Sequence, residues 1–285
     1  MRRESAAKCL FTSDLHGRTG RYALLLGAIE KEQPDAVFIG GDLLSPITAG
    51  DRFLEEHLFA GLRRLRRGAG RPFRFFVILG NDDPRAFEET LVGAEENGLL
   101  EYVHDRTVPF GGLFVTGYSC VPPTPFPSKD WEKYDVSRHV DPGCVSPEEG
   151  YRSVPVDPRR ARFETIAADL NGLVGNAPPD RTIFLFHAPP YGSSLDRAAL
   201  DGRMVDHAPV DVHVGSVAMA RFIEERQPLA TLHGHVHEAP RLTGRWRERI
   251  GRTWAFSGCH DGPGLALVRF DAGDPGAATR EILGE

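Results

Sequence analysis

Short apolar runs alternate with amphipathic stretches through the first third of the chain. The runs "KCLFTSD", "DAVFIGGD" and "FRFFVILGND" predict three buried strands. Between the first two runs, apolar residues recur at the helical spacing i, i+3, i+4 and i+7. They are Tyr22, Leu25, Leu26 and Ile29. Two further helices are predicted, one over about residues 51–67 and one through "PRAFEETLVGAEENG". This alternation indicates an α/β fold.

The second half of the chain continues in the same way. "VPFGGLFVTGYS" has the glycine turn of a hairpin. Asp157 as the N-cap and Pro158 at the first position predict the start of another helix. Its predicted buried face is Phe163, Ile166, Ala167 and Leu170. Strands are predicted at "TIFLFH", "LATLHGH", "RTWAFSG" and "LALVRF", with a helix near residues 217–226.

Between residues 119 and 155 this regularity stops. The segment is rich in proline and has no clean period, and it is too long for an ordinary connection. It is also too aromatic for a flexible linker. We therefore expect residues 1–285 to form one domain, with an ordered insertion at about residues 119–155 that acts as a lid, a dimer contact or both.

Composition narrows the class of protein. The chain has 285 residues, of which 41% are hydrophobic and 26% charged, with a formal net charge of −6. No strongly basic field indicates a nucleic-acid partner. Four cysteines without a CxxC pair argue against a zinc knuckle and a disulfide scaffold. Neither a signal peptide nor an apolar run of membrane-spanning length is evident, so we expect a cytoplasmic protein without a membrane partner.

Polar residues of metal-binding types directly follow five of the predicted strands, where loops in α/β folds converge. They are Asp14, His16, Asp42, Asn81, His187, His235 and His237. Asp14 and His16 are two residues apart, as are His235 and His237. Residues at this spacing on extended backbone point the same way, so each pair can face one ion. Two carboxylates, one amide and four imidazoles exceed what one ion can take. They suit two ions that share one carboxylate.

In this order, the motifs D-x-H, G-D, G-N-x-[D/E], H and G-H-x-H resemble those of the calcineurin-like metallophosphoesterases over residues 13–238. The resemblance implies a four-layer αββα sandwich of two packed mixed β-sheets flanked by helices. It also implies that Asp14, His16 and His237 hold one divalent metal and that Asn81, His187 and His235 hold the other, with Asp42 as the bridge. A hydroxide between the metals would attack phosphorus. The ligands are compatible with manganese, iron, nickel or zinc.

One position departs from the family. Many members carry a histidine after the asparagine, and here Asp82 takes its place. Close to two cations Asp82 should be ionised, which makes it a poor proton donor and repels a phosphomonoester dianion more than a diester monoanion. His260, in a glycine-rich loop, is either a replacement acid or an ordinary surface histidine. Asp82 and His260 are therefore the candidate catalytic residues.

Three more residues are candidates for a supporting or substrate-contacting role. Asp83 is expected to be the N-cap of the next helix, with a role near the ligands as the alternative. Tyr191 could contact the substrate or only pack, and Glu238 could support His237.

These observations favour a phosphodiesterase that acts on a small phosphoester. A phosphomonoesterase, a nuclease and a non-catalytic metal-binding scaffold of the same fold remain as alternatives. Assembly into a homo-oligomer is left open.

Overall fold

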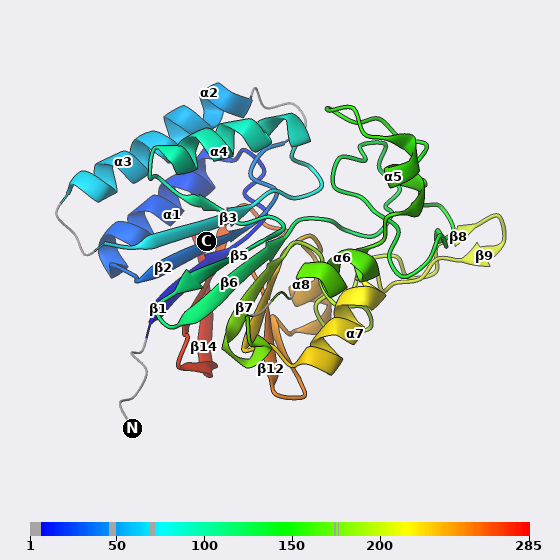
Figure 1. Ribbon diagram of the computed structural model, residues 1–285. Coiled ribbons are helices and arrows are strands. Elements are labelled where there is room, and N and C mark those ends of the chain that lie inside the picture. The colour runs from blue at the N-terminus through cyan, green and yellow to red at the C-terminus, as the bar shows by residue number, and fades with distance from the viewer. Residues whose placement is uncertain (1–6, 46–49, 69–71, 174, 176) are drawn as a thin grey trace.

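The computed structural model describes residues 7–45, 50–68, 72–173, 175 and 177–285, and it contains two six-stranded sheets (Figure 1). The first sheet has the order β14-β13-β1-β2-β3-β4. Strands β1 to β4 run parallel to one another, while β13 and β14 are antiparallel additions. The bounds are β1 (Lys8–Thr12), β2 (Ala36–Gly40), β3 (Arg74–Ile78), β4 (Glu101–Tyr102), β13 (Leu265–Asp271) and β14 (Asp274–Leu283).

The second sheet has the order β11-β12-β10-β7-β6-β5. Its four central strands are parallel, and an antiparallel strand closes each edge. The bounds are β5 (Arg106–Phe110), β6 (Leu113–Tyr118), β7 (Thr182–Phe186), β10 (Ala230–His233), β11 (Arg247–Ile250) and β12 (Thr253–Ser257). A separate small hairpin pairs β8 (Met204–Val205) with β9 (Ala208–Pro209).

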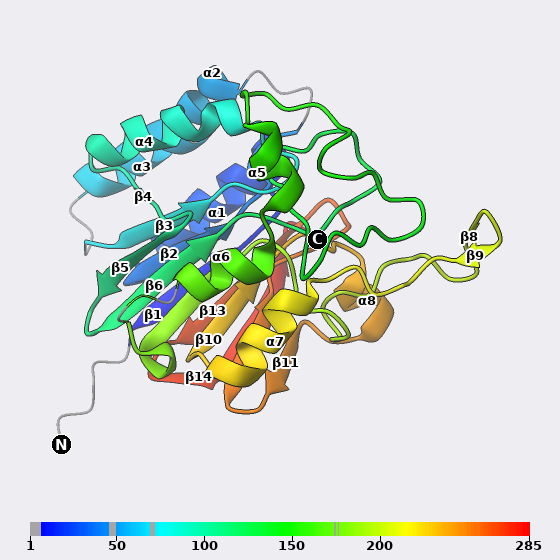
Figure 2. The same ribbon diagram turned by 45° about the vertical axis from the view of Figure 1, so that its right-hand side comes forward.

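Helices cover the outer face of each sheet, which gives the four layers that the family resemblance implied (Figure 2). Over the first sheet lie α1 (Thr19–Glu32), α2 (Gly50–Leu54), the π-helical η1 (Glu55–Phe59), α3 (Ala60–Arg67), the short η2 (Arg85–Phe87) and α4 (Glu88–Glu96). Over the second lie α6 (Ile166–Leu173) and α7 (Val217–Arg226). The remaining short helices are α5 (Pro158–Phe163), η3 (Pro179–Arg181) and α8 (Ala239–Thr243). No helix among the described residues is long and apolar enough to cross a membrane.

The central core lies between the two sheets and is rich in phenylalanine. Phe11, Phe38, Phe76 and Phe256 are all fully buried there. A parallel strand is buried on both faces, so its sequence is a nearly continuous apolar run rather than an alternating one. This explains why β2, "AVFIG", is buried at every position.

The helix predicted from residue 157 starts as expected but does not continue. Asp157 accepts a hydrogen bond from the backbone N–H of Arg159, as a capping residue does. The helix then ends at Phe163, and a second one begins at Ile166. The prediction that Phe163 lies on the buried face is wrong, since 65% of this residue is exposed. The insertion explains the break: Ile166 donates its backbone N–H to the carbonyl of Tyr134 instead of to a preceding turn.

The segment 119–155 contains isolated bridges but no regular helix or strand. Trp131 and Tyr134 are buried, whereas Phe126 and Tyr151 are more than half exposed. A fully buried ion pair joins Lys129 to Glu132. These contacts make the segment ordered, as predicted. Its proposed roles as a lid or a dimer contact stay predictions.

Candidate metal centre

The seven candidate ligands all follow the carboxyl end of a parallel strand. Asp14 and His16 follow β1, Asp42 follows β2 and Asn81 follows β3 in the first sheet. His187 follows β7, while His235 and His237 follow β10 in the second. Carboxyl ends of parallel strands lie at one edge of a sheet. A hydrogen bond from His187 Nδ1 to the carbonyl of Gly40, 2.7 Å long, joins the two edges.

Four of these residues form one tight group. Asp14, His16, Asp42 and His237 each offer one donor atom, and these atoms lie within 4.8 Å of one another. His237 Nε2 is 2.9 Å from His16 Nε2 and 3.1 Å from Asp14 Oδ1. We call Asp14, His16 and His237 the first ligand group.

Asn81, His187 and His235 form the second ligand group. Asn81 Oδ1 lies 3.0 Å from His187 Nε2 and 2.7 Å from His235 Nδ1. Asp42 lies between the two groups, because its Oδ2 is 3.8 Å from His16 Nε2 and 3.5 Å from His187 Nε2. The structure thus brings together all seven residues that the sequence singled out, in the two groups expected.

The donor atoms fit divalent metal ions. The carbonyl of Gly40 can only accept, so His187 Nδ1 carries the hydrogen of the neutral ring and Nε2 presents a lone pair. That lone pair faces two further acceptors, Asn81 Oδ1 and Asp42 Oδ2. Three acceptors that face one another need a proton or a cation between them. Mixed nitrogen and oxygen donors are a suitable set for a divalent transition metal.

The pKa values in the absence of a cation indicate the same demand for positive charge. Burial would lower the pKa of His187, but the Asp42 carboxylate and Asp14 raise it to about 10. Burial would likewise lower the pKa of His16, and contacts with Asp82, Asp42 and Asp14 raise it to about 9. The pKa of His235 is instead lowered to about 3, by burial and by the charge of His187. The carboxylates therefore draw in protons where metal ions would otherwise lie.

The backbone at the site is strained. Asp14, His16, Asp42 and His235 have φ angles of 59°, 48°, 52° and 75°, in the left-handed region that non-glycine residues rarely adopt. Gly80 and Gly234 leave room for the ligands, because a Cβ on Gly80 would collide with Asp42 and one on Gly234 with Ser13. Strain of this kind persists only where the surrounding structure enforces it, and it concentrates at functional sites.

Asp82 contacts both ligand groups and the shared carboxylate. Its Oδ2 is 3.3 Å from His16 Nδ1, and its Oδ1 accepts a hydrogen bond of 3.2 Å from Asn81 Nδ2. Its backbone N–H donates to Asp42 Oδ1 over 2.9 Å. The Asp82 side chain is 32% exposed, so solvent reaches it as well.

The prediction that Asp83 is a helix N-cap is wrong. Its buried carboxylate accepts hydrogen bonds from the backbone N–H groups of Leu43 (3.1 Å), Leu44 (2.7 Å) and Gly80 (2.9 Å). Pro84 stands at the N-cap of η2 without a side-chain bond. Asp83 instead ties the loop after β2 to the loop after β3.

The side chains of the other three candidates have hydrogen-bond partners that are not among the seven candidate ligands. His260 Nε2 lies 2.7 Å from Glu285 Oε1. The hydroxyl of Tyr191 donates to Asp211 over 2.7 Å. Glu238 Oε1 accepts from the backbone N–H of Ala199 over 3.0 Å. Nothing in these contacts gives His260 or Glu238 the role near the ligands that the sequence suggested.

Two residues at the site were not anticipated. The thiol of Cys259 donates to Asp14 Oδ2 over 3.1 Å. It follows β12 as the seven candidate ligands follow their strands, and that position could have pointed to it. Arg21 donates to the carbonyls of Asp14, His260 and Gly262 from within α1. An arginine on a helix carries no such signal in sequence.

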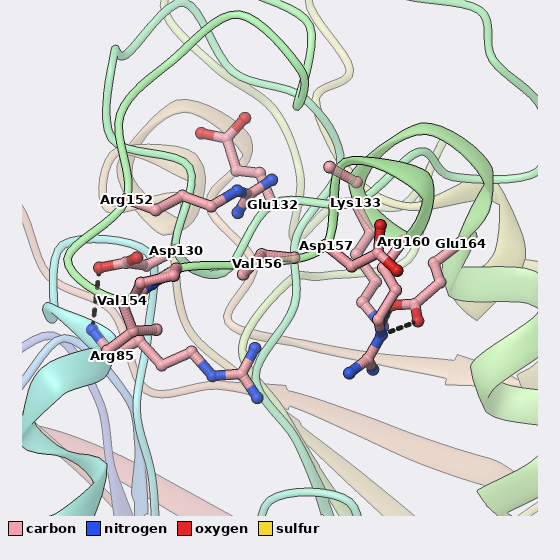
Figure 3. Close-up of a pocket in the computed structure, with 12 residues that line it drawn as sticks. Arg85, Asp130, Glu132, Lys133, Arg152, Val154, Val156, Asp157, Arg160 and Glu164 are labelled. Atoms are coloured by element: carbon pink, nitrogen blue, oxygen red, sulfur yellow. Dashed lines mark hydrogen bonds and ion pairs between the residues drawn. The ribbon is translucent and has the colours of Figure 1, made fainter.

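A separate cavity of about 340 Å³ lies between the insertion, α5 and Arg85 at the start of η2 (Figure 3). Its lining has four cationic and four anionic side chains, so it favours neither charge. Two of these oppositely charged side chains, Lys133 and Glu164, form an ion pair of 2.8 Å. Arg85 stands on its wall, 5.0 Å from the ring of Trp131. None of the candidate ligands is among the residues that line this cavity.

The comparisons with known proteins bear on family and fold. A family model described as calcineurin-like phosphoesterase matches residues 7–239. One crystal structure has a TM-score of 0.62 at 18% identity, covering 98% of this chain and 100% of that chain. The crystal structure of TT1561 of Thermus thermophilus has a TM-score of 0.59 at 17% identity, covering 98% of this chain and 99% of that chain. The structure of GAP50, the anchor in the inner membrane complex of Plasmodium, has a TM-score of 0.50 at 9% identity, covering 98% of this chain and 90% of that chain. No curated protein sequence matches significantly.

Proposed function

The chain belongs to the calcineurin-like phosphoesterase family, and we propose that it is a metal-dependent phosphodiesterase with a dinuclear centre. Asp14, His16 and His237 would hold one divalent ion, and Asn81, His187 and His235 the other. Asp42 would bind both. Manganese, iron, nickel and zinc all suit these ligands.

The position of Asp42 is the observation that carries this proposal. One oxygen of a single carboxylate lies within 4 Å of a histidine nitrogen from each ligand group. Two divalent ions bound here would activate a water molecule for attack at phosphorus and offset the charge that develops there. The protein supplies fixed donors from strand ends, which keeps the cost of reorganisation during the reaction small.

The substrate would approach from the side where His16, Asp82 and His237 reach solvent. The side chains of His16, Asp82 and His237 are 14%, 32% and 33% exposed, whereas His187 is fully buried. A phosphate that reaches the centre would therefore pass close to the carboxylate of Asp82.

That carboxylate is the reason for preferring a diester. At a separation of about 6 Å and an effective dielectric of about 20, a carboxylate costs about 3 kcal/mol for each unit of phosphate charge. A monoester dianion would experience about twice the repulsion of a diester monoanion. This difference in repulsion supports a small phosphodiester as the substrate class and leaves the identity of the substrate open.

The test is hydrolysis of bis-p-nitrophenyl phosphate beside p-nitrophenyl phosphate, with manganese and again with chelator. We expect turnover that chelator abolishes and that favours the diester. Monoester preference would keep the metal centre and remove the charge argument. Absence of turnover of either ester by metal-loaded protein would contradict the enzyme assignment.

A non-catalytic scaffold is the second candidate. GAP50, which is described as an anchor, shares the fold at a TM-score of 0.50. The presence of all seven candidate ligands in this chain favours catalysis instead.

A further inference from the structure

We propose that Asp82 is a positioning residue that orients one ligand of each metal position. The inference rests on the proposed dinuclear function and adds a role to the residue that stands where many relatives carry a histidine. It depends on three contacts, each made to a different candidate ligand.

The first contact fixes His16. Asp82 Oδ2 lies 3.3 Å from His16 Nδ1, so the ring carries its hydrogen on Nδ1 and presents Nε2 to the first metal position. His16 Nε2 is the atom that lies 2.9 Å from His237 Nε2. A carboxylate behind a ligating imidazole also raises the basicity of the ligating nitrogen.

The second contact fixes Asn81. The Nδ2 group of Asn81 donates to Asp82 Oδ1 over 3.2 Å, which turns Oδ1 toward His187 and His235. Rotation of the amide by half a turn would point two N–H donors, which cannot bind a cation, at the second metal position. Asp82 therefore selects the orientation of Asn81 that allows binding.

The third contact belongs to the backbone. The N–H of Asp82 donates to Asp42 Oδ1 over 2.9 Å and leaves Oδ2 between the two ligand groups. Substitution of the side chain keeps this bond. Variants at position 82 thus test the side-chain contacts to His16 and Asn81 while this backbone bond stays in place.

A carboxylate suits this position better than a histidine would. Two donors, His16 Nδ1–H and Asn81 Nδ2–H, must be accepted at once by one side chain. Ionised aspartate has two acceptor oxygens, whereas neutral histidine has a single acceptor nitrogen. Asp82 therefore provides two acceptor oxygens at the position where a histidine would provide a proton donor.

The experiment is calorimetric titration of the metal-free protein with manganese chloride. Wild type is compared with Asp82→Ala, Asp82→Asn and a control, Asp141→Asn. Asp141 also lies 3.3 Å from a histidine, His139, but on the surface away from the candidate ligands. Far-ultraviolet circular dichroism checks that each variant is folded.

We expect Asp82→Ala to weaken both manganese-binding steps by about 10- to 100-fold, the usual cost of losing such support. Asp82→Asn is nearly isosteric, and its amide can accept from only one of the two ligands, so one step should weaken. Asp141→Asn should match wild type. Two manganese ions bound by Asp82→Ala with wild-type affinity would overturn the proposal.

The titration separates this role from the proposed function. Manganese binding that depends on Asp82, without ester hydrolysis, would refute the phosphodiesterase and keep the positioning role. Ester hydrolysis together with manganese binding that does not depend on position 82 would keep the phosphodiesterase and refute the positioning role. If Asp82 only repelled substrate, Asp82→Asn would raise monoester turnover and leave both affinities unchanged.

Discussion

The two ligand groups are supported in different ways. In the second group, His187 is fully buried and its Nδ1–H donates to the carbonyl of Gly40, the last residue of β2. In the first group, His16 is partly exposed and its Nδ1 faces the side chain of Asp82. One imidazole is thus fixed by the sheet itself, and the other by a replaceable side chain on a loop. The difference teaches that one ligating imidazole, His187, is rigidly held and buried, whereas the other, His16, is reached by solvent.

Loss of the shared ligand should have the largest effect, because it acts on both groups. We expect Asp42→Ala to lower kcat/KM for the diester by more than about 10³-fold, or about 4 kcal/mol of transition-state stabilisation. Steady-state kinetics with saturating manganese measures it. Asp141→Ala is the matched surface control. A loss below tenfold would mean that Asp42 does not bridge.

Replacing the two supported histidines sharpens the comparison. Without metal, His187→Ala should lower the free energy of unfolding by about 3 kcal/mol, since it leaves a buried carboxylate without its partner. His16→Ala should cost about 1 kcal/mol, because water reaches this position. Urea denaturation with chelator measures both. Equal losses would erase the distinction between the groups.

His104, whose ring lies 4.9 Å from the ring of Trp131, should make the stability of the protein depend on pH. Burial lowers the pKa of His104 to about 3, with Arg85 and Lys133 adding to the shift. The folded protein therefore resists a proton that the unfolded chain binds below about pH 6.5. The contribution of His104 to stability is complete above that value and falls as pH drops, by about 2 kcal/mol between pH 6.5 and 5. His104→Gln should flatten this dependence in urea denaturation; an unchanged slope would exclude His104 as its source.

The smallest effect is expected at the insertion. The indole of Trp131 donates to the carbonyl of Asp83 over 2.8 Å. Trp131→Phe removes this bond and should lower the free energy of unfolding by about 1 kcal/mol. Tyr151→Phe, at a residue 60% exposed, is the control. If the two substitutions cost the same, Trp131 does not anchor the loop.

The sequence predicted most of the fold because the strands carry their signal locally. Runs such as β2 are apolar at every position, and the buried face of α1 follows the helical period. β14 was not anticipated, since it mixes buried and exposed residues and has proline and glycine near its start. The break after Phe163 also escaped prediction, because the carbonyl that competes for Ile166 belongs to Tyr134, distant in sequence.

The candidate site likewise has features that the sequence predicted and features that it could not predict. The candidate ligands could be found because each follows a strand, and parallel strands bring their ends together. Supporting contacts could not, because they join separate loops through side chains. The Asp83 carboxylate, which reaches Leu43 and Leu44, has the same sequence signature as an N-cap. Asp82 and His16 are likewise far apart in sequence and meet only in the fold.

Metal content tests the central claim most directly. Wild type and Asp42→Asn would be dialysed against manganese, passed through a desalting column and measured by elemental analysis. We predict about two manganese ions per wild-type chain and a clear loss in Asp42→Asn. One ion or none in wild type, or full occupancy without the Asp42 carboxylate, would contradict a dinuclear centre shared through that residue.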